Sequence, residues 1–222
     1  GKKIKSIVAT DFAGNPCNWK RLSLIAKKYR IKLINDNCHA LGAKYNGNKS
    51  YAAFYADIVV HSYHAVKNIT TGEGGAVLTN NKDIYDKIKI LRSHGVVKNK
   101  TNREPWNYEM RFLGYNYRIS DIQCSLGISQ LKKLSNFVKK RNSIAKIYKE
   151  VFSGNKLFKI QEIRKDDYNG HHLFPLLIDF QKSGKKKLGL FKFLKKKNIH
   201  LQVHYTPIHL QPFYMKKFGY KK

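Results

Sequence analysis

The hydrophobic pattern of the first 92 residues alternates between short apolar runs and amphipathic stretches. Short apolar runs predict strands at residues 3–9, 31–34, 57–61 and 75–79. Apolar positions at helical spacing predict a helix over 18–29, with Asn18 as its N-cap, and another over 82–92. Residues 42–56 are polar and glycine-containing, which predicts a loop. Strands that alternate with helices favour an α/β fold with a largely parallel sheet.

The second half of the chain has a different order of elements. Ser120 opens a helical pattern that continues to Phe152, and Gly154 is a natural stop. Gly127 weakens this helix in its middle, or permits close packing against it. The pattern then predicts a strand over 171–180, a helix over 185–197 and a strand over 199–205. We therefore expect two domains, residues 1–140 and residues 141–222.

The net charge of +30 is the unusual feature of the composition. Such a charge suits a protein that binds nucleic acid or an anionic membrane. Here the charge is mostly lysine spread along predicted helices and loops, without the basic-aromatic motifs of single-strand binders. The runs 185–187 and 195–197 flank apolar residues, as the solvated ends of an amphipathic helix do. We therefore predict neither a nucleic-acid nor a membrane partner.

The cysteines and histidines show no metal-binding framework. Cys17, Cys38 and Cys124 are isolated and odd in number, which favours a reducing compartment such as the cytoplasm. His61 and His64 have the spacing of metal ligands, but no cysteine or acidic cluster lies beside them. We expect no metal site.

One lysine stands out chemically. Lys67 lies between the predicted strands at 57–61 and 75–79, together with hydroxyl side chains and the three glycines at positions 72, 74 and 75. A lysine in such surroundings is poorly solvated, and a desolvated amine is the nucleophile that a Schiff base requires. This segment alone slightly favours the alternative, a glycine-rich hairpin that carries a solvated lysine.

Asp36 favours the interpretation of Lys67 as a reactive amine. It closes the strand pattern that begins at Ile31, and His39 follows three residues later. A carboxylate at the end of a buried parallel strand lies where open α/β sheets bind ligands. If Lys67 held pyridoxal 5′-phosphate, the cofactor would need a carboxylate beside its pyridinium nitrogen. The alternative is that Asp36 caps the segment after it.

Five segments together carry a family resemblance. They occupy residues 11–14, 36–43, 62–75, 91–95 and 114–123, among them Asp11-Phe12-Ala13-Gly14 and Gly72-Glu73-Gly74-Gly75. In order and spacing the chain resembles the DegT/StrS-type nucleotide-sugar aminotransferases over nearly its whole length. The resemblance implies fold type I of the pyridoxal-phosphate-dependent transferases. Residues 1–140 would belong to the large, mostly parallel sheet domain, and residues 141–222 to the small C-terminal α/β domain.

The resemblance also assigns roles to matching residues. Lys67 would be the catalytic residue, which binds the cofactor covalently and then carries a proton as base and acid. Asp36 would keep the pyridine nitrogen protonated, and His39 would lie near the ring and its 3′ oxygen. Ser62 would bind the cofactor phosphate. A core histidine and a locally bonded serine remain the alternatives for the last two.

Further roles concern the partner subunit and the sugar. Asn116 matches an asparagine that reaches the phosphate from the other subunit, which implies a homodimer with composite active sites. The alternative for Asn116 is a turn residue before a helix. His204, Tyr205 and His209 lie in a region that the family uses near the sugar, although such residues after a strand are often structural.

The implied reaction is transfer of an amino group from an amino acid, L-glutamate, to C4 of a 4-keto-6-deoxy UDP-N-acetylhexosamine, for surface or flagellar sugars. The stretch 202–208 carries the resemblance to this subfamily. The alternatives are another 3- or 4-ketosugar aminotransferase and an inactive fragment or nucleotide-sugar-binding module. Related dehydratases replace the lysine by histidine, and Lys67 argues against them. Members of the family are longer, so we expect an internal portion of the enzyme.

Overall fold

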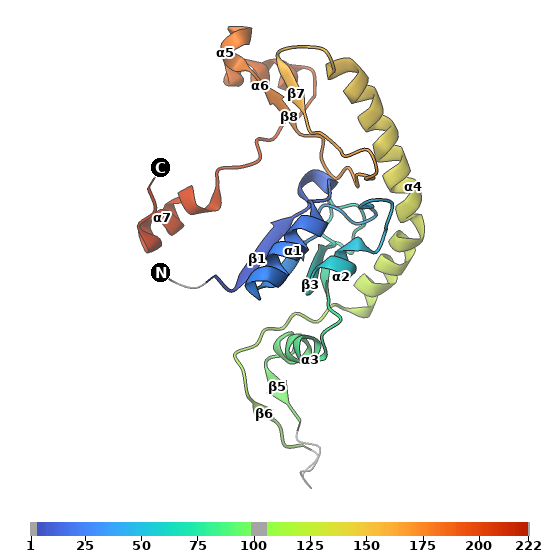
Figure 1. Cartoon of the computed structure of the whole chain (residues 1–222), viewed down its shortest axis with the longest axis vertical. Helices are drawn as coiled ribbons and strands as arrows, with labels where there is room; N and C mark the ends of the chain where they lie inside the picture. The colour runs from blue at the N-terminus through green and yellow to red at the C-terminus, as the bar shows by residue number, and fades with distance from the viewer. Residues whose placement is uncertain (1–3, 99–105, 222) are drawn as a thin grey trace. The chain divides into compact units, whose positions relative to one another are not determined.

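Four strands form the sheet that positions the candidate site (Figure 1). In sheet order they are β1 (Ser6–Thr10), β2 (Lys32–Asp36), β3 (Ile58–Ser62) and β4 (Gly75–Leu78). The first three are parallel, and β4 runs antiparallel to β3. Thr10 pairs with Asp36, and Asp36 pairs with Val60. The carboxyl ends of the three parallel strands therefore lie along one edge, as expected for an α/β sheet.

The computed structural model describes residues 4–98 and 106–221. The chain divides into two compact units. Unit 1 comprises residues 1–155 and 159–177, and unit 2 comprises residues 156–158 and 178–222. The whole sheet belongs to unit 1.

Two helices and one short turn cover the sheet in unit 1. After β1, the 3-10 turn η1 (Phe12–Gly14) leads to α1 (Trp19–Tyr29), whose N-cap Asn18 accepts a hydrogen bond from Arg21 N–H at 3.2 Å. This confirms the predicted cap. Helix α2 (Tyr51–Tyr55) lies within the predicted loop at 42–56, which is therefore only partly loop. No helical signal is visible here in the sequence, because five residues are too few to show a helical period.

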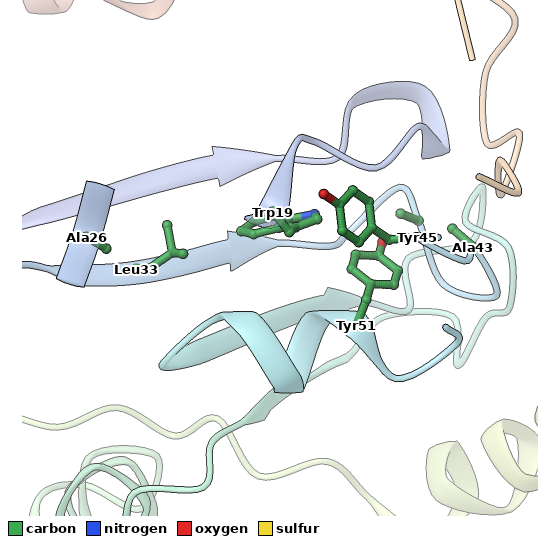
Figure 2. Packing of buried hydrophobic residues seen from close by; sticks show 7 residues of the cluster. Trp19, Ala26, Leu33, Ala43, Tyr45 and Tyr51 are labelled. Atoms are coloured by element: carbon green, nitrogen blue, oxygen red, sulfur yellow. The ribbon is translucent and has the colours of Figure 1, made fainter. Parts of the chain in front are cut away.

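The core of unit 1 lies between these helices and the sheet. Figure 2 shows the Trp19 indole close to Leu33 of β2 and to the rings of Tyr45 and Tyr51. The Trp19 and Tyr51 ring centroids are 6.4 Å apart, and those of Tyr45 and Tyr51 are 6.1 Å apart. The fully buried Asp11 accepts hydrogen bonds within this aromatic cluster. The first family-like motif thus anchors the loop that follows β1.

Two more of the family-like motifs pair with each other. They follow α3 (Lys82–Leu91) and flank the two-stranded sheet of β5 (Val96–Val97) and β6 (Glu109–Met110). His94 N–H donates to the Tyr115 carbonyl at 2.8 Å, and Tyr117 N–H donates to the Arg92 carbonyl at 2.9 Å. A Cβ on Gly114 would lie 2.1 Å from Gly95 N, so this crossing requires glycine.

The long helix α4 (Asp121–Phe152) confirms the predicted helix almost residue for residue. Ser120 and Gln123 form a capping box, and Ser153 is the C-cap. A Cβ on Gly127 would lie 3.0 Å from Thr71 Cγ2. The glycine therefore permits close packing of the helix on the lysine loop. Helix α4 runs unbroken through residue 140. The domain division expected at this position stays a prediction.

The remaining elements lie beyond α4. Strands β7 (Phe158–Ile160) and β8 (Leu176–Ile178) pair with each other. Unit 2 contains α5 (Phe180–Ser183), α6 (Lys187–Lys196), the 3-10 turn η2 (Ile208–Leu210) and α7 (Pro212–Phe218). Helix α6 confirms the predicted helix at 185–197. In the described part of the chain, no helix has the length and apolar character needed to cross a bilayer.

Two strand predictions are wrong. Only residues 176–178 of the predicted strand at 171–180 are extended, because residues 170–173 bond to the loop after β1 and His171 has a left-handed φ of 43°. The predicted strand at 199–205 is irregular backbone, since no described strand pairs with it. Apolar alternation cannot distinguish a strand from a loop that packs on another segment.

Candidate active site

The predicted carboxylate lies at the end of β2. Asp36 Oδ1 accepts a hydrogen bond from Cys38 N–H at 3.2 Å, and Oδ2 accepts one from Thr10 Oγ1 at 3.3 Å. Asp36 therefore caps the turn after its strand, as the alternative interpretation held, while its second oxygen faces the edge of the sheet. Sequence reasoning missed Thr10, although a hydroxyl at the end of a neighbouring parallel strand was a usable signal.

The lysine belongs to a closed loop between β3 and β4. Tyr63 N–H donates to the Gly74 carbonyl at 2.8 Å, and Thr71 N–H donates back to the Tyr63 carbonyl at 2.9 Å. Within this closure Lys67 N–H donates to the His64 carbonyl at 3.0 Å, and the Lys67 side chain is partly buried. The segment is thus a hairpin-like connection with a fixed backbone, which holds the lysine beside the strand ends.

The Cys38 thiol follows Asp36 on the loop after β2. Burial raises the pKa of Cys38 to about 12, helped by a hydrogen bond to Asp36 and by the charge of that carboxylate. The Lys67 ammonium opposes this effect and lowers the pKa of the same thiol. Both charges therefore lie within electrostatic reach of Cys38. Asp36 ends β2, and the loop that carries Lys67 begins at the end of β3, the strand that pairs with β2. Their joint role in one site stays a prediction.

His39 lies on the loop after β2. Its Nδ1 accepts a hydrogen bond from Ala13 N–H at 3.3 Å. Its ring centroid is 5.8 Å from that of Phe12 and 4.4 Å from that of His172. Sequence reasoning placed residues 171–180 in a strand and missed His172, whose only signal was the histidine pair at 171–172.

Ser62 and Asn116 are both on the surface of unit 1. Ser62 Oγ accepts a hydrogen bond from His64 N–H at 3.4 Å, so it bonds locally and is partly exposed. Asn116 is exposed and forms an isolated bridge with Ser93. Its neighbour Tyr117 is 71% exposed. Large exposed aromatic side chains are typical of surfaces that contact another protein.

The remaining candidates are the sugar-contacting residues and the histidine pair with metal-ligand spacing. His204, Tyr205 and His209 belong to unit 2, and their assignment to the sugar stays a prediction. His64 Nε2 lies 3.7 Å from Glu73 Oε1. Across residues 4–98 and 106–221, no group of three or more His, Cys, Asp or Glu side chains is arranged to hold a metal ion.

Comparison with known protein families identifies the family of this chain. The profile described as the DegT/DnrJ/EryC1/StrS aminotransferase family matches residues 1–222. The chain belongs to this aminotransferase family. Its mixed sheet with helices is that of fold type I, the fold of the pyridoxal-phosphate-dependent sugar aminotransferases. The family and fold inferred from five sequence segments are confirmed.

Individual relatives of this aminotransferase chain have related names. It is 44% identical to the UDP-4-amino-4,6-dideoxy-N-acetyl-beta-L-altrosamine transaminase of Campylobacter jejuni, over 97% of this chain and 56% of that protein. It is 32% identical to the spore coat polysaccharide biosynthesis protein SpsC of Bacillus subtilis, over 99% of this chain and 57% of that protein.

A solved structure shows the same fold. Helicobacter pylori PseC, an aminotransferase involved in the biosynthesis of pseudoaminic acid, superposes with a TM-score of 0.85 at 34% identity. The match covers 98% of this chain and 57% of PseC. The chain thus spans a little over half the length of the relatives that it matches.

Proposed function

We propose that the protein carrying this chain transfers an amino group from an amino acid, L-glutamate, to C4 of a 4-keto-6-deoxy UDP-N-acetylhexosamine. The cofactor would be pyridoxal 5′-phosphate. The observation that supports this most directly is that Asp36 ends β2 and that the Lys67 loop begins at the end of β3, the strand paired with β2, because the chemistry needs a carboxylate and an amine at one strand edge. The names of the Campylobacter and Helicobacter relatives support the choice of sugar.

The residues present fit the cofactor. Lys67 would bind it covalently through Nζ, Asp36 would face its ring nitrogen, and Ser62 would contact its phosphate. When bound, pyridoxal phosphate supplies an electron sink for the carbon that gains or loses the amino group. The two hydrogen bonds to Asp36, from Thr10 and from Cys38 N–H, hold the carboxylate in place.

Two steps fall to side chains of this chain. Lys67 Nζ would remove a proton from the amino-bearing carbon of the donor and return it on the acceptor side, as general base and then general acid. A charged Asp36 carboxylate beside the ring nitrogen would stabilise the protonated form of that nitrogen. The closed loop around Lys67 fixes its backbone, so only side-chain motion is needed between these roles.

Exposed residues and the net charge support the proposed partner subunit and substrate. Asn116 and its exposed aromatic neighbours would face a second copy of the protein, so that each active site contains an asparagine from the partner subunit. His204, Tyr205 and His209 would contact the sugar. The net charge of +30 would attract the doubly charged nucleotide of the substrate.

Two substitutions test the proposal in the protein that carries this chain. Lys67→Ala should abolish the absorbance of lysine-bound cofactor and amino transfer from glutamate to the UDP-4-keto sugar. Lys49→Ala is the control, because Lys49 is exposed and lies outside the site. Wild-type turnover in Lys67→Ala would refute the assignment.

Asp36→Asn removes the negative charge of the side chain but keeps its size and shape. The amide oxygen can still accept from Cys38 N–H, so the turn should keep its geometry. The cofactor should still bind to Lys67, but turnover should fall strongly because an amide does not hold the ring nitrogen protonated. An unchanged turnover rate would leave Asp36 as a structural cap only.

A further inference from the structure

The segment between α4 and β8 returns to the loops that carry the site. Gly170 N–H donates to the Gly14 carbonyl at 2.9 Å, and Leu173 N–H donates to the Ala13 carbonyl at 3.4 Å. A Cβ on Gly14 would lie 2.6 Å from His171 N, so the approach depends on glycine at this position. The return segment therefore belongs to the structural surroundings of the loop after β1.

His39 is enclosed by these same elements. Ala13 links both sides of the arrangement, because its N–H donates to His39 Nδ1 and its carbonyl accepts from Leu173 N–H. The His172 ring contacts the His39 ring at a centroid distance of 4.4 Å, and Phe12 contacts it at 5.8 Å. The tilted contact with the His172 ring, at an interplanar angle of 45°, and the hydrogen bond to Nδ1 together restrict both the plane and the rotation of the His39 imidazole.

Side chains of helix α4 form hydrogen bonds with the main chain of the return segment. The Arg141 guanidinium donates through one nitrogen to the carbonyls of His171 and His172, at 3.2 and 3.3 Å. Asn142 Nδ2 donates to the Asn169 carbonyl at 3.0 Å. These side-chain donors satisfy main-chain carbonyls that no strand partner bonds. The position of the His172 ring is therefore set by α4 as well as by the loop.

We propose that His172 is a positioning residue for His39, and that Arg141 acts through it by holding the main chain of the return segment. Since His39 Nδ1 accepts a hydrogen bond, the neutral ring carries its proton on Nε2. His172 keeps the ring in the orientation in which that bond forms. His39 then presents an Nε2–H donor to an oxygen of the ligand, and this last step rests on the proposed function.

The tautomer of His39 can be measured without any ligand. Nitrogen-15 NMR of histidine-labelled, cofactor-free protein distinguishes the two ring nitrogens, and a His39→Gln variant assigns the signals. The wild type should show neutral His39 with its proton on Nε2. His172→Ala should give a mixture of tautomers, whereas His172→Phe, which keeps a ring, should restore the wild-type pattern.

His171→Asn is the matched control. His171 is the adjacent imidazole, its backbone has a left-handed φ that asparagine tolerates, and its ring has no described contact with the His39 ring. This variant should leave the His39 signals unchanged. Circular dichroism confirms that each variant is folded. A folded His172→Ala protein with the wild-type His39 tautomer would overturn the proposal, as would an equal effect of His171→Asn.

A second measurement uses protein loaded with pyridoxal phosphate. His172→Ala should lower kcat by about 10-fold or more, since small misplacements of a site residue have effects of this order. His172→Phe should recover most of the loss. A normal kcat in His172→Ala would overturn the positioning role. If the wild type binds no pyridoxal phosphate, the proposed function fails, and the NMR result alone then decides the role of His172.

Discussion

Removal of the Asp11 carboxylate should strongly destabilise unit 1. Asp11 is fully buried, and its Oδ1 accepts from Cys17 N–H at 2.7 Å and from Trp19 Nε1–H at 2.9 Å. Its Oδ2 accepts from Asn37 Nδ2 at 2.8 Å and from the Tyr51 hydroxyl at 2.7 Å. Asp11→Ala would remove the acceptor for all four donors at once.

The magnitude follows from which donors stay unpaired. Asn37 Nδ2 keeps its bond to the Tyr51 oxygen, and Cys17 N–H is only partly buried. The Trp19 indole and the Tyr51 hydroxyl remain buried without acceptors, at about 1–3 kcal/mol each. With the smaller losses at the other two donors, Asp11→Ala should lower the free energy of unfolding by about 3–5 kcal/mol. Tyr51→Phe, which removes one bond to a charged acceptor, should cost about 1.5–3 kcal/mol.

The assay uses the two tryptophans of the chain. Trp106 is 73% exposed, so Trp106→Phe leaves Trp19 as a single fluorescent reporter of the core. Urea unfolding in this background gives the midpoint and the slope for each variant. Asp166→Ala, at an exposed aspartate, should change the free energy by no more than about 0.5 kcal/mol. If Asp11→Ala matches this control, the carboxylate does not organise the core.

Two further predictions concern glycine positions and pH. Gly114→Ala should destabilise the protein by about 1–3 kcal/mol, because the new Cβ would clash with the Gly95 backbone. Gly189→Ala within α6 places its Cβ in open space and should stabilise the protein by about 0.5–1 kcal/mol. Thermal unfolding should therefore show a lower midpoint for the first variant and a higher midpoint for the second. Burial lowers the pKa of His61, against a hydrogen bond to the Asn37 backbone. The unfolded chain therefore binds this proton more tightly, so stability from neutral His61 is present above about pH 6.5 and is lost as the pH falls through the lower folded pKa. His61→Gln should flatten the stability profile in that window, and an unchanged profile would contradict this assignment.

Local patterns were sufficient for the elements whose determinants are neighbours in the chain. The helix that begins after Ser120 was predictable because its cap and its apolar spacing are local. Asn18 was predictable for the same reason. The family resemblance added the proposed roles of Lys67 and Asp36, because the order and spacing of its motifs assign matching residues to one site.

Contacts between distant segments escaped prediction. The return segment at 168–173 looked like part of a strand, but its backbone bonds to residues 13 and 14, more than 150 positions earlier. The crossing of Gly95 and Gly114 joins two motifs that the sequence showed only as separate matches. A glycine signals that space or an unusual φ is needed, but it does not identify the segment that approaches.

The sequence by itself therefore determined the α/β class and the long capped helix, and it named Lys67 and Asp36 as candidates. It could do so because periodicity, capping and strand-end chemistry act over a few residues. Only the tertiary structure decided that Asp36 caps the turn after β2, that Asp11 joins four donors, and that His172 lies against His39. The last two of these relations join segments that are far apart in the sequence. The chain must form a long loop to bring such segments together, and the contact itself offsets the entropy cost of that loop. Local sequence does not specify which distant segment makes the contact.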